Sequence, residues 1–297
     1  MASLQLPPAT CGTSSSSLSA CPARPATDFS PLPPPFSLIR STPDATLAYE
    51  HYCTLFDRQG HLRAVYDPAA PYLRHRTPLL AWLVECCESE LRLDALTVSS
   101  AVALLDYYCS TVTTLPAHSL QLIALCSTLI ATKYCAAETE APTLSQLVQC
   151  AGNVYSADQL RAAELWCLQR ADWSVGVITA THFIEHLCQP YTLQLIITRD
   201  DAPPASHTHL SKQLVRCIHY LDHLCLRSPL LCALPPSLLA SSIVCAARHC
   251  VGLSSWHDGL RSVLDGERDE TLMWAGQVLD WHAAAQQQSQ PTASMEL

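Results

Sequence analysis

Apolar residues recur with helical spacing in ten segments between residues 77 and 284, and polar stretches separate these segments. The first five segments cover 77–91, 96–110, 120–134 and two stretches that open at Thr143 and Ser156. The second five cover 178–188, 210–226, 235–250, 254–264 and 270–284. In each set the third segment is the most apolar, as expected for a central helix that is surrounded by four others. The pattern predicts an all-α fold of two tandem five-helix bundles.

Several segments begin with helix start signals. Thr77 is a candidate N-cap, and Pro78 then stands in the first helical position, where a missing N–H costs nothing. The pairs Thr143 with Gln146 and Ser156 with Gln159 have the spacing of capping boxes. These signals predict helix starts at residues 78, 144 and 157.

The chain divides into two bundles and two tails. Residues 1–42 are rich in serine and proline, so we expect a disordered tail that buries little apolar surface. An additional helix near 44–59 precedes the first bundle, and we assign 43–175 to the first domain together with this helix. The second domain is expected at 176–284, with a loose tail at 285–297.

Composition limits the function classes. A net charge of −9 disfavours nucleic-acid binding, which depends on clustered lysine and arginine. The 16 cysteines include no CxxC pair and mostly occupy apolar helical positions, so we expect free thiols in a reducing compartment and no metal or cofactor. No apolar run is long enough to span a membrane, and the first residues lack the features of a signal peptide. We therefore expect a soluble intracellular protein.

Lysine is rare in this chain, with two lysines against fifteen arginines. One of the two, Lys133, ends the apolar segment LQLIALCSTLIATKY, and Glu164 follows 31 residues later in QLRAAELWCLQRADW. On local sequence alone, Lys133 could simply extend to water beyond the last apolar turn. Glu164 could likewise be an ordinary solvated helix residue.

The order of several motifs favours a specific role for this pair. RTPLLAWLVE, AVALLDYY, LQLIALCSTLIATKY, YSADQLRAAELWCLQRADWSV and TATHFIEHL occur in this order from residue 76 to residue 187. The ordered set resembles the cyclin family, in particular two-box cyclins of the mitotic A/B type, over about residues 45–284. The resemblance implies a non-enzymatic subunit of the nucleus or cytoplasm that binds and activates a cyclin-dependent Ser/Thr kinase in cell-cycle control.

The resemblance also implies roles for individual residues. Lys133 and Glu164 would contact the kinase backbone just before its regulatory helix. Tyr134, Trp173 and Val175 match apolar positions that press on that helix, although Trp173 and Val175 could instead belong to the core. Arg76 and Asp106 match an internal salt bridge between two helices.

A second surface is implied for substrate or inhibitor peptides with an RxL motif. The matching residues are Leu79, Trp82, Glu85, Leu120 and Gln121. His75 and Pro78 replace the apolar residues that are usual in this groove. After Tyr134 the chain continues with Cys135 and Ala136 in place of the acidic residues common in cyclins, which leaves the choice of kinase open.

Two other interpretations remain. His182, Glu185 and His186 form an HxxEH pattern that also occurs in a class of zinc peptidases, and His219 and His223 lie one helical turn apart. The alternative to kinase activation is a cyclin-fold scaffold, as in the B-type general transcription factor or the retinoblastoma pocket. A scaffold would have no need to keep Lys133 and Glu164 together.

Overall fold

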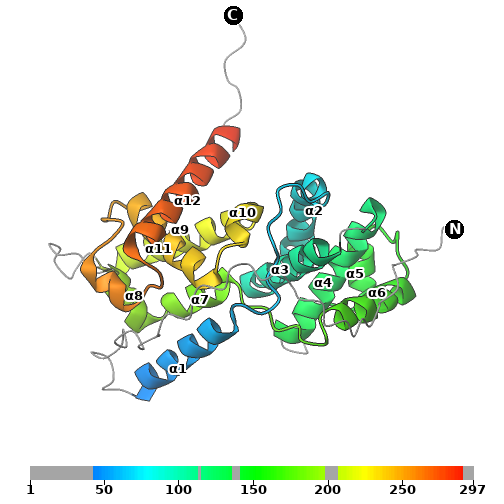
Figure 1. The fold of residues 1–297 in the computed structure, drawn as a ribbon, viewed down its shortest axis with the longest axis horizontal. Coiled ribbons are helices and arrows are strands. Elements are labelled where there is room, and N and C mark those ends of the chain that lie inside the picture. The colour runs from blue at the N-terminus through cyan, green and yellow to red at the C-terminus, as the bar shows by residue number, and fades with distance from the viewer. Residues whose placement is uncertain (1–42, 113–114, 136–140, 198–206, 290–297) are drawn as a thin grey trace, which may run out of the picture.

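The computed structural model describes residues 43–112, 115–135, 141–197 and 207–289, and every regular element in these ranges is helical. The predicted all-α class is therefore confirmed. Two bundles lie side by side along the long axis of the molecule (Figure 1). The expected tail 1–42 and residues 290–297 lie outside the described ranges.

The first bundle is built around α4 (Leu120–Cys135), whose residues from Leu122 to Thr132 are all buried. Its neighbours provide the ring that the sequence pattern predicts. They are α2 (Leu73–Glu85), a π-helical turn η1 (Cys86–Glu90), α3 (Ala95–Thr111), α5 (Leu144–Cys150) and α6 (Ala157–Arg170). A short 3₁₀ turn, η2 (Ala117–Ser119), leads into α4.

The second bundle is built around α11 (Pro236–Cys250), which is buried from Pro236 to Arg248. Helices α7 (Ala180–Leu187), α9 (His207–Cys225) and α12 (Arg268–Ser289) pack against it. The remaining elements are α8 (Pro190–Ile197), the short α10 (Pro229–Cys232) and the 3₁₀ turn η4 (Asp258–Ser262). No described helix combines the length and the apolar character that a membrane crossing requires.

The two predicted capping boxes are confirmed. The Thr143 and Ser156 hydroxyls accept hydrogen bonds from the backbone N–H groups of Gln146 and Gln159, and each glutamine side chain accepts one back from its cap residue. Four N–H groups at each helix start lack an intrahelical partner, so these caps fix where α5 and α6 begin.

Three boundaries differ from the sequence prediction. Helix α2 begins at Leu73, so Thr77 is not its N-cap and Pro78 lies inside the helix. Pro78 lacks the N–H that would donate to the carbonyl of Arg74, so the first part of α2 does without one intrahelical hydrogen bond. The predicted helix over 254–264 is only the short turn η4, and α8 completes the five-helix set instead. Helix α12 continues to Ser289, into the expected tail.

The first helix, α1 (Pro43–Arg58), packs on the second bundle rather than on the first. Leu55 is buried in the second core, and Tyr52 lies edge-on against Phe183 of α7 with ring centroids 5.6 Å apart. Figure 1 shows α1 running alongside α7. The sequence prediction grouped this helix with the first bundle in the domain 43–175, whereas its packing is on the second bundle, because short-range sequence order does not determine which core a connecting helix covers.

Candidate functional site

Lys133 and Glu164 come from two helices that pack directly against each other. Lys133 is the first exposed residue after the buried run of α4, and Glu164 lies on α6 between the buried Ala163 and the exposed Leu165. Burial of the α4 face fixes the last turn of that helix, so the direction of Lys133 is set by core packing. The helices thereby bring together two residues that are 31 positions apart.

The two side chains form an ion pair, with Lys133 Nζ 2.5 Å from Glu164 Oε1. The side chain of Lys133 is 55% exposed, whereas that of Glu164 is only 14% exposed. Hydrogen bonds stabilise a carboxylate with so little access to water more than they stabilise an exposed carboxylate. The ammonium group retains donors for an external acceptor, because a lysine carries three N–H bonds.

Large apolar side chains that follow these two residues in the sequence are exposed. Tyr134 follows Lys133 and is 51% exposed, Leu165 follows Glu164 and is 47% exposed, and Trp173 just beyond α6 is 64% exposed. Apolar residues exposed at the rim of a charged pair are typical of a protein interface, where aromatic residues are enriched.

The backbone at Trp173 is unusual. Asp172 and Trp173 both adopt left-handed conformations, with φ of 46° and 62°. The Trp173 N–H donates to the carbonyl of Leu168 at 2.9 Å and closes the end of α6. A bulky residue in this region costs free energy, and nothing in the core requires the indole, which belongs to neither core cluster.

Val175 differs from Trp173 in its surroundings. It is half-buried and packs against the core of the first bundle. Val175 therefore belongs in part to the core, as one of the two interpretations of the sequence allowed. Trp173 does not belong to the core.

The end of α1 also reaches this surface, which the sequence interpretation missed. Arg58 donates a hydrogen bond to the Tyr134 hydroxyl at 3.2 Å, and His61 Nε2 lies 3.2 Å from the carbonyl oxygen of Ser174. Gly176 lies directly against the Arg58 guanidinium and the Tyr134 ring, where a β-carbon would collide with both side chains. No local pattern marks Arg58, because it is separated from Tyr134 by 76 residues.

Arg76 and Asp106 form a buried, bidentate salt bridge between α2 and α3. Arg76 Nη2 lies 2.7 Å from Asp106 Oδ2 and Nε lies 2.8 Å from Oδ1, while the Tyr72 hydroxyl donates to Oδ1 at 2.9 Å. Arg76 also donates to the carbonyl groups of Leu226 and Arg227 in the second bundle. One guanidinium therefore joins two helices of the first bundle to the second bundle.

The residues of the expected docking groove lie at α2 and at the start of α4. Leu79, Trp82 and Gln121 are half-buried, Glu85 is exposed and Leu120 is buried. Gln121 accepts a hydrogen bond from the Tyr155 hydroxyl at 3.4 Å. His75 and Pro78, the two departures from the apolar pattern, are both exposed on α2.

The HxxEH segment forms part of the second bundle. His182 Nδ1 accepts a hydrogen bond from the Thr179 N–H at 3.1 Å, and the His186 ring packs 5.5 Å from that of Tyr52. Burial lowers the pKa of both histidines to about 4. Within the described residues, the potential ligand atoms of His182, Glu185 and His186 do not converge as a metal site would require.

The second histidine pair has a different partner. His223 Nε2 lies 3.0 Å from Glu88 Oε1, which links α9 to the π-helical turn of the first bundle. This contact belongs to the junction of the two bundles rather than to a metal site with His219.

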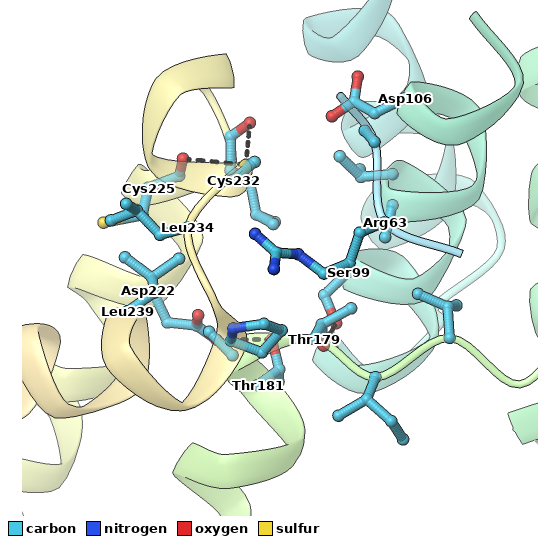
Figure 2. Close-up of a pocket in the computed structure, with 18 of the residues that line it drawn as sticks. Arg63, Ser99, Asp106, Thr179, Thr181, Asp222, Cys225, Cys232, Leu234 and Leu239 are labelled. Atoms are coloured by element: carbon cyan, nitrogen blue, oxygen red, sulfur yellow. Dashed lines mark hydrogen bonds between the residues drawn. The ribbon is translucent and has the colours of Figure 1, made fainter. Parts of the chain in front are cut away.

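A cavity lies between the two bundles (Figure 2). Arg63 extends into it and donates a hydrogen bond to the carbonyl of Ala233, and burial lowers the pKa of Arg63. On the wall formed by the second bundle, Asp222 accepts a hydrogen bond from the Thr181 hydroxyl at 2.8 Å. Burial raises the pKa of Asp222 to about 7, and Glu185 contributes to the increase. This carboxyl therefore gains or loses its charge close to neutral pH.

Comparison with known proteins identifies two matching domain models. The model described as "Cyclin, N-terminal domain" matches residues 57–176, and the model described as "Cyclin, C-terminal domain" matches residues 178–295. These boundaries separate the two bundles seen in the structure.

Individual relatives are more distant. Cyclin-D of Ostreococcus tauri is 32% identical over 206 residues, which cover 66% of this chain and 53% of that protein. Cyclin-B1-3 of Oryza sativa subsp. japonica is 28% identical over 234 residues, which cover 76% of this chain and 45% of that protein. The chain thus spans about half the length of these curated relatives.

A solved structure shares the fold. The X-ray structure of a viral cyclin from herpesvirus saimiri matches with a TM-score of 0.61 and 19% sequence identity. The match covers 80% of this chain and 97% of the viral chain. At this identity, the similarity concerns the arrangement of the helices alone.

Proposed function

The chain belongs to the cyclin family, with both cyclin boxes present, and from this membership we propose that it binds and activates a cyclin-dependent Ser/Thr protein kinase. Cyclins are non-catalytic regulatory subunits, so the chemistry would belong to the kinase. The proposal places the contact at the surface formed by Lys133, Glu164 and the exposed aromatic residues beside them.

The ion pair of Lys133 and Glu164 carries this proposal. Its geometry leaves N–H donors of Lys133 exposed while Glu164 is largely shielded, and the residue after each of them, Tyr134 and Leu165, is an exposed apolar side chain. Backbone carbonyl and N–H groups of a partner would complete these hydrogen bonds, each worth about 1.5–3 kcal/mol when charge-assisted. Tyr134 and Trp173 would supply apolar contact area, since aromatic residues dominate interface energetics.

The proposed mechanism is a population shift. Docking would hold the regulatory helix of the kinase inward, so that its glutamate reaches the catalytic lysine. A shift from about 1% to about 99% active kinase requires roughly 5.5 kcal/mol of differential binding. A few charge-assisted hydrogen bonds together with the aromatic contacts are sufficient for this amount.

We propose no single cyclin type, and therefore no single kinase, for this chain. Those motifs favoured a mitotic A/B type, but the relative named cyclin-D is 32% identical to this chain, against 28% for the relative named cyclin-B1-3. We therefore extend the proposal to cell-cycle kinases in general, acting in the nucleus or cytoplasm.

A second partner is proposed for the α2 surface. Leu79, Trp82, Glu85, Leu120 and Gln121 would bind RxL-type peptides, with Glu85 available to the arginine and Trp82 to the leucine. The half-buried state of Leu79 and Trp82 supports this role, because a peptide can cover them further. The exposed His75 and Pro78 reduce the apolar area that the α2 surface presents to such a peptide.

The decisive experiment measures kinase activity after co-expression of this chain with a panel of cyclin-dependent kinases. We expect the double substitution Lys133→Ala, Glu164→Ala to abolish activation while the protein remains folded by circular dichroism. The matched control is Asp158→Ala, Arg161→Ala, because these residues form an exposed ion pair at 2.7 Å on the same helix α6. If the wild type neither binds nor activates any kinase of the panel, the cyclin-fold scaffold becomes the better interpretation.

A further inference from the structure

Two cysteines and a glutamate converge at one end of the first bundle, away from the proposed kinase surface. Cys86 and Glu90 are the first and last residues of the π-helical turn η1, and Cys150 is the last residue of α5. Their ligand atoms, two Sγ and one carboxylate oxygen, all lie within 4.8 Å of one another. Cys86 Sγ also lies 3.9 Å from the carbonyl oxygen of Cys150.

We propose that Cys86, Glu90 and Cys150 form a binding site for a thiophilic divalent cation of the Zn²⁺ class. Zinc takes thiolate and carboxylate ligands at about 2.3 Å and about 2.0 Å, which separates neighbouring ligand atoms of a tetrahedral site by about 3.5–3.8 Å. The ligand atoms lie at most 4.8 Å apart, so a contraction of up to about 1.3 Å brings the cluster to this geometry. Water fills the fourth position, on the side where Glu90 is exposed.

A metal that binds this cluster must displace protons from both thiols. Burial raises the pKa of Cys86 to about 11 and that of Cys150 to about 12, so both thiols are protonated at neutral pH in the absence of metal. Binding replaces two S–H bonds with two metal–sulfur bonds and releases two protons to solvent. The carboxylate of Glu90 contributes a further negative charge, which leaves the occupied site with a net charge of −1.

The backbone of this region is built around the cluster. The N–H of Leu91 donates to the carbonyl of Cys86 at 3.0 Å, five residues earlier, which makes a wide π turn at the end of α2. Such turns are rare and frequently occur at functional sites. A bound metal would fasten the end of α2 to the end of α5, two segments that are 64 residues apart.

The chain contains a matched control for this proposal. Burial and the neighbouring thiol of Cys250 raise the pKa of Cys217 to about 12, so these two residues form a second thiol pair. No carboxylate or histidine joins them within the described residues to make a third ligand. The double substitution Cys217→Ser, Cys250→Ser therefore removes two neighbouring thiols without touching the proposed site.

The experiment titrates the reduced full chain with Co²⁺, whose thiolate complexes absorb in the near ultraviolet, and then displaces the Co²⁺ with Zn²⁺. We expect about one bound ion per chain. Glu90→Gln should weaken Zn²⁺ binding by about tenfold or more, and Cys86→Ser, Cys150→Ser should abolish the absorption band. The Cys217→Ser, Cys250→Ser control should retain the band, and circular dichroism should show that all variants are folded.

Three outcomes would overturn the proposal. The first is the absence of a thiolate band in the folded wild type. The second is a band that survives in Cys86→Ser, Cys150→Ser. The third is a reduced protein that binds no metal but forms a Cys86–Cys150 disulfide on mild oxidation, detected by mass spectrometry, because the cluster would then be a redox pair.

Discussion

Lys133 and Glu164 form an ion pair whose two members differ in exposure, with 55% of the lysine side chain but only 14% of the glutamate side chain accessible. The pair is therefore neither a fully solvated surface contact nor a buried structural bridge. Because Lys133 is the exposed member, we expect its removal to affect kinase binding more than folding.

Lys133→Ala should lower the free energy of unfolding by about 1–2 kcal/mol, because the ammonium itself is exposed but the shielded Glu164 loses a donor. The affinity of this variant for a kinase that the wild type activates should fall by at least about tenfold, because one charge-assisted hydrogen bond is lost. Urea unfolding and a kinase-binding titration measure the two quantities. Arg161→Ala on α6 should change neither, and a loss of more than about 3 kcal/mol in Lys133→Ala would show a structural role instead.

Trp173→Asn tests whether the exposed indole belongs to the interface. The indole is 64% exposed at a φ of 62°, where asparagine is better tolerated than tryptophan. We expect stability to be unchanged or up to about 1 kcal/mol higher, together with weaker kinase activation. Thermal unfolding and kinase assays check this. A marked loss of stability would show that the indole serves the core.

Arg76→Met should be strongly destabilising, because it leaves the buried Asp106 without its guanidinium and frees two carbonyl groups of the second bundle. The expected loss is about 3–5 kcal/mol, the range for breaking a buried salt bridge. Urea unfolding measures it, with Arg161→Met as the exposed counterpart. Equal effects of the two substitutions would contradict the role of Arg76 as a link between the bundles.

Asp222→Asn should change how stability depends on pH. Burial raises the pKa of Asp222 in the folded protein to about 7 from 3.8, so its stabilising contribution is complete below pH 3.8 and is lost as the pH rises toward 7. The asparagine variant has no such loss and keeps an oxygen that accepts from Thr181. The variant should therefore gain on the wild type by roughly 4 kcal/mol between pH 4 and pH 8.

Urea unfolding of both proteins across this range measures the difference. His182 and His186 titrate in both proteins, so their contributions cancel in the comparison. A difference between Asp222→Asn and wild type that does not vary with pH would contradict the raised pKa.

The sequence by itself determined the helical class, the two bundles and the central place of the two most apolar segments. It did so because helical periodicity and capping boxes are local properties, readable over a few turns. The ordered motifs, through their resemblance to a family, also marked Lys133 and Glu164 as a candidate pair.

Only the tertiary structure decided which distant segments meet. Arg58 reaches Tyr134 across 76 residues, and Cys86 meets Cys150 across 64 residues without any CxxC spacing. Helix α1 covers the second core although it precedes the first bundle. Such contacts depend on how side chains from the whole chain pack together. A local sequence pattern can therefore predict a helix without predicting which other helices it contacts.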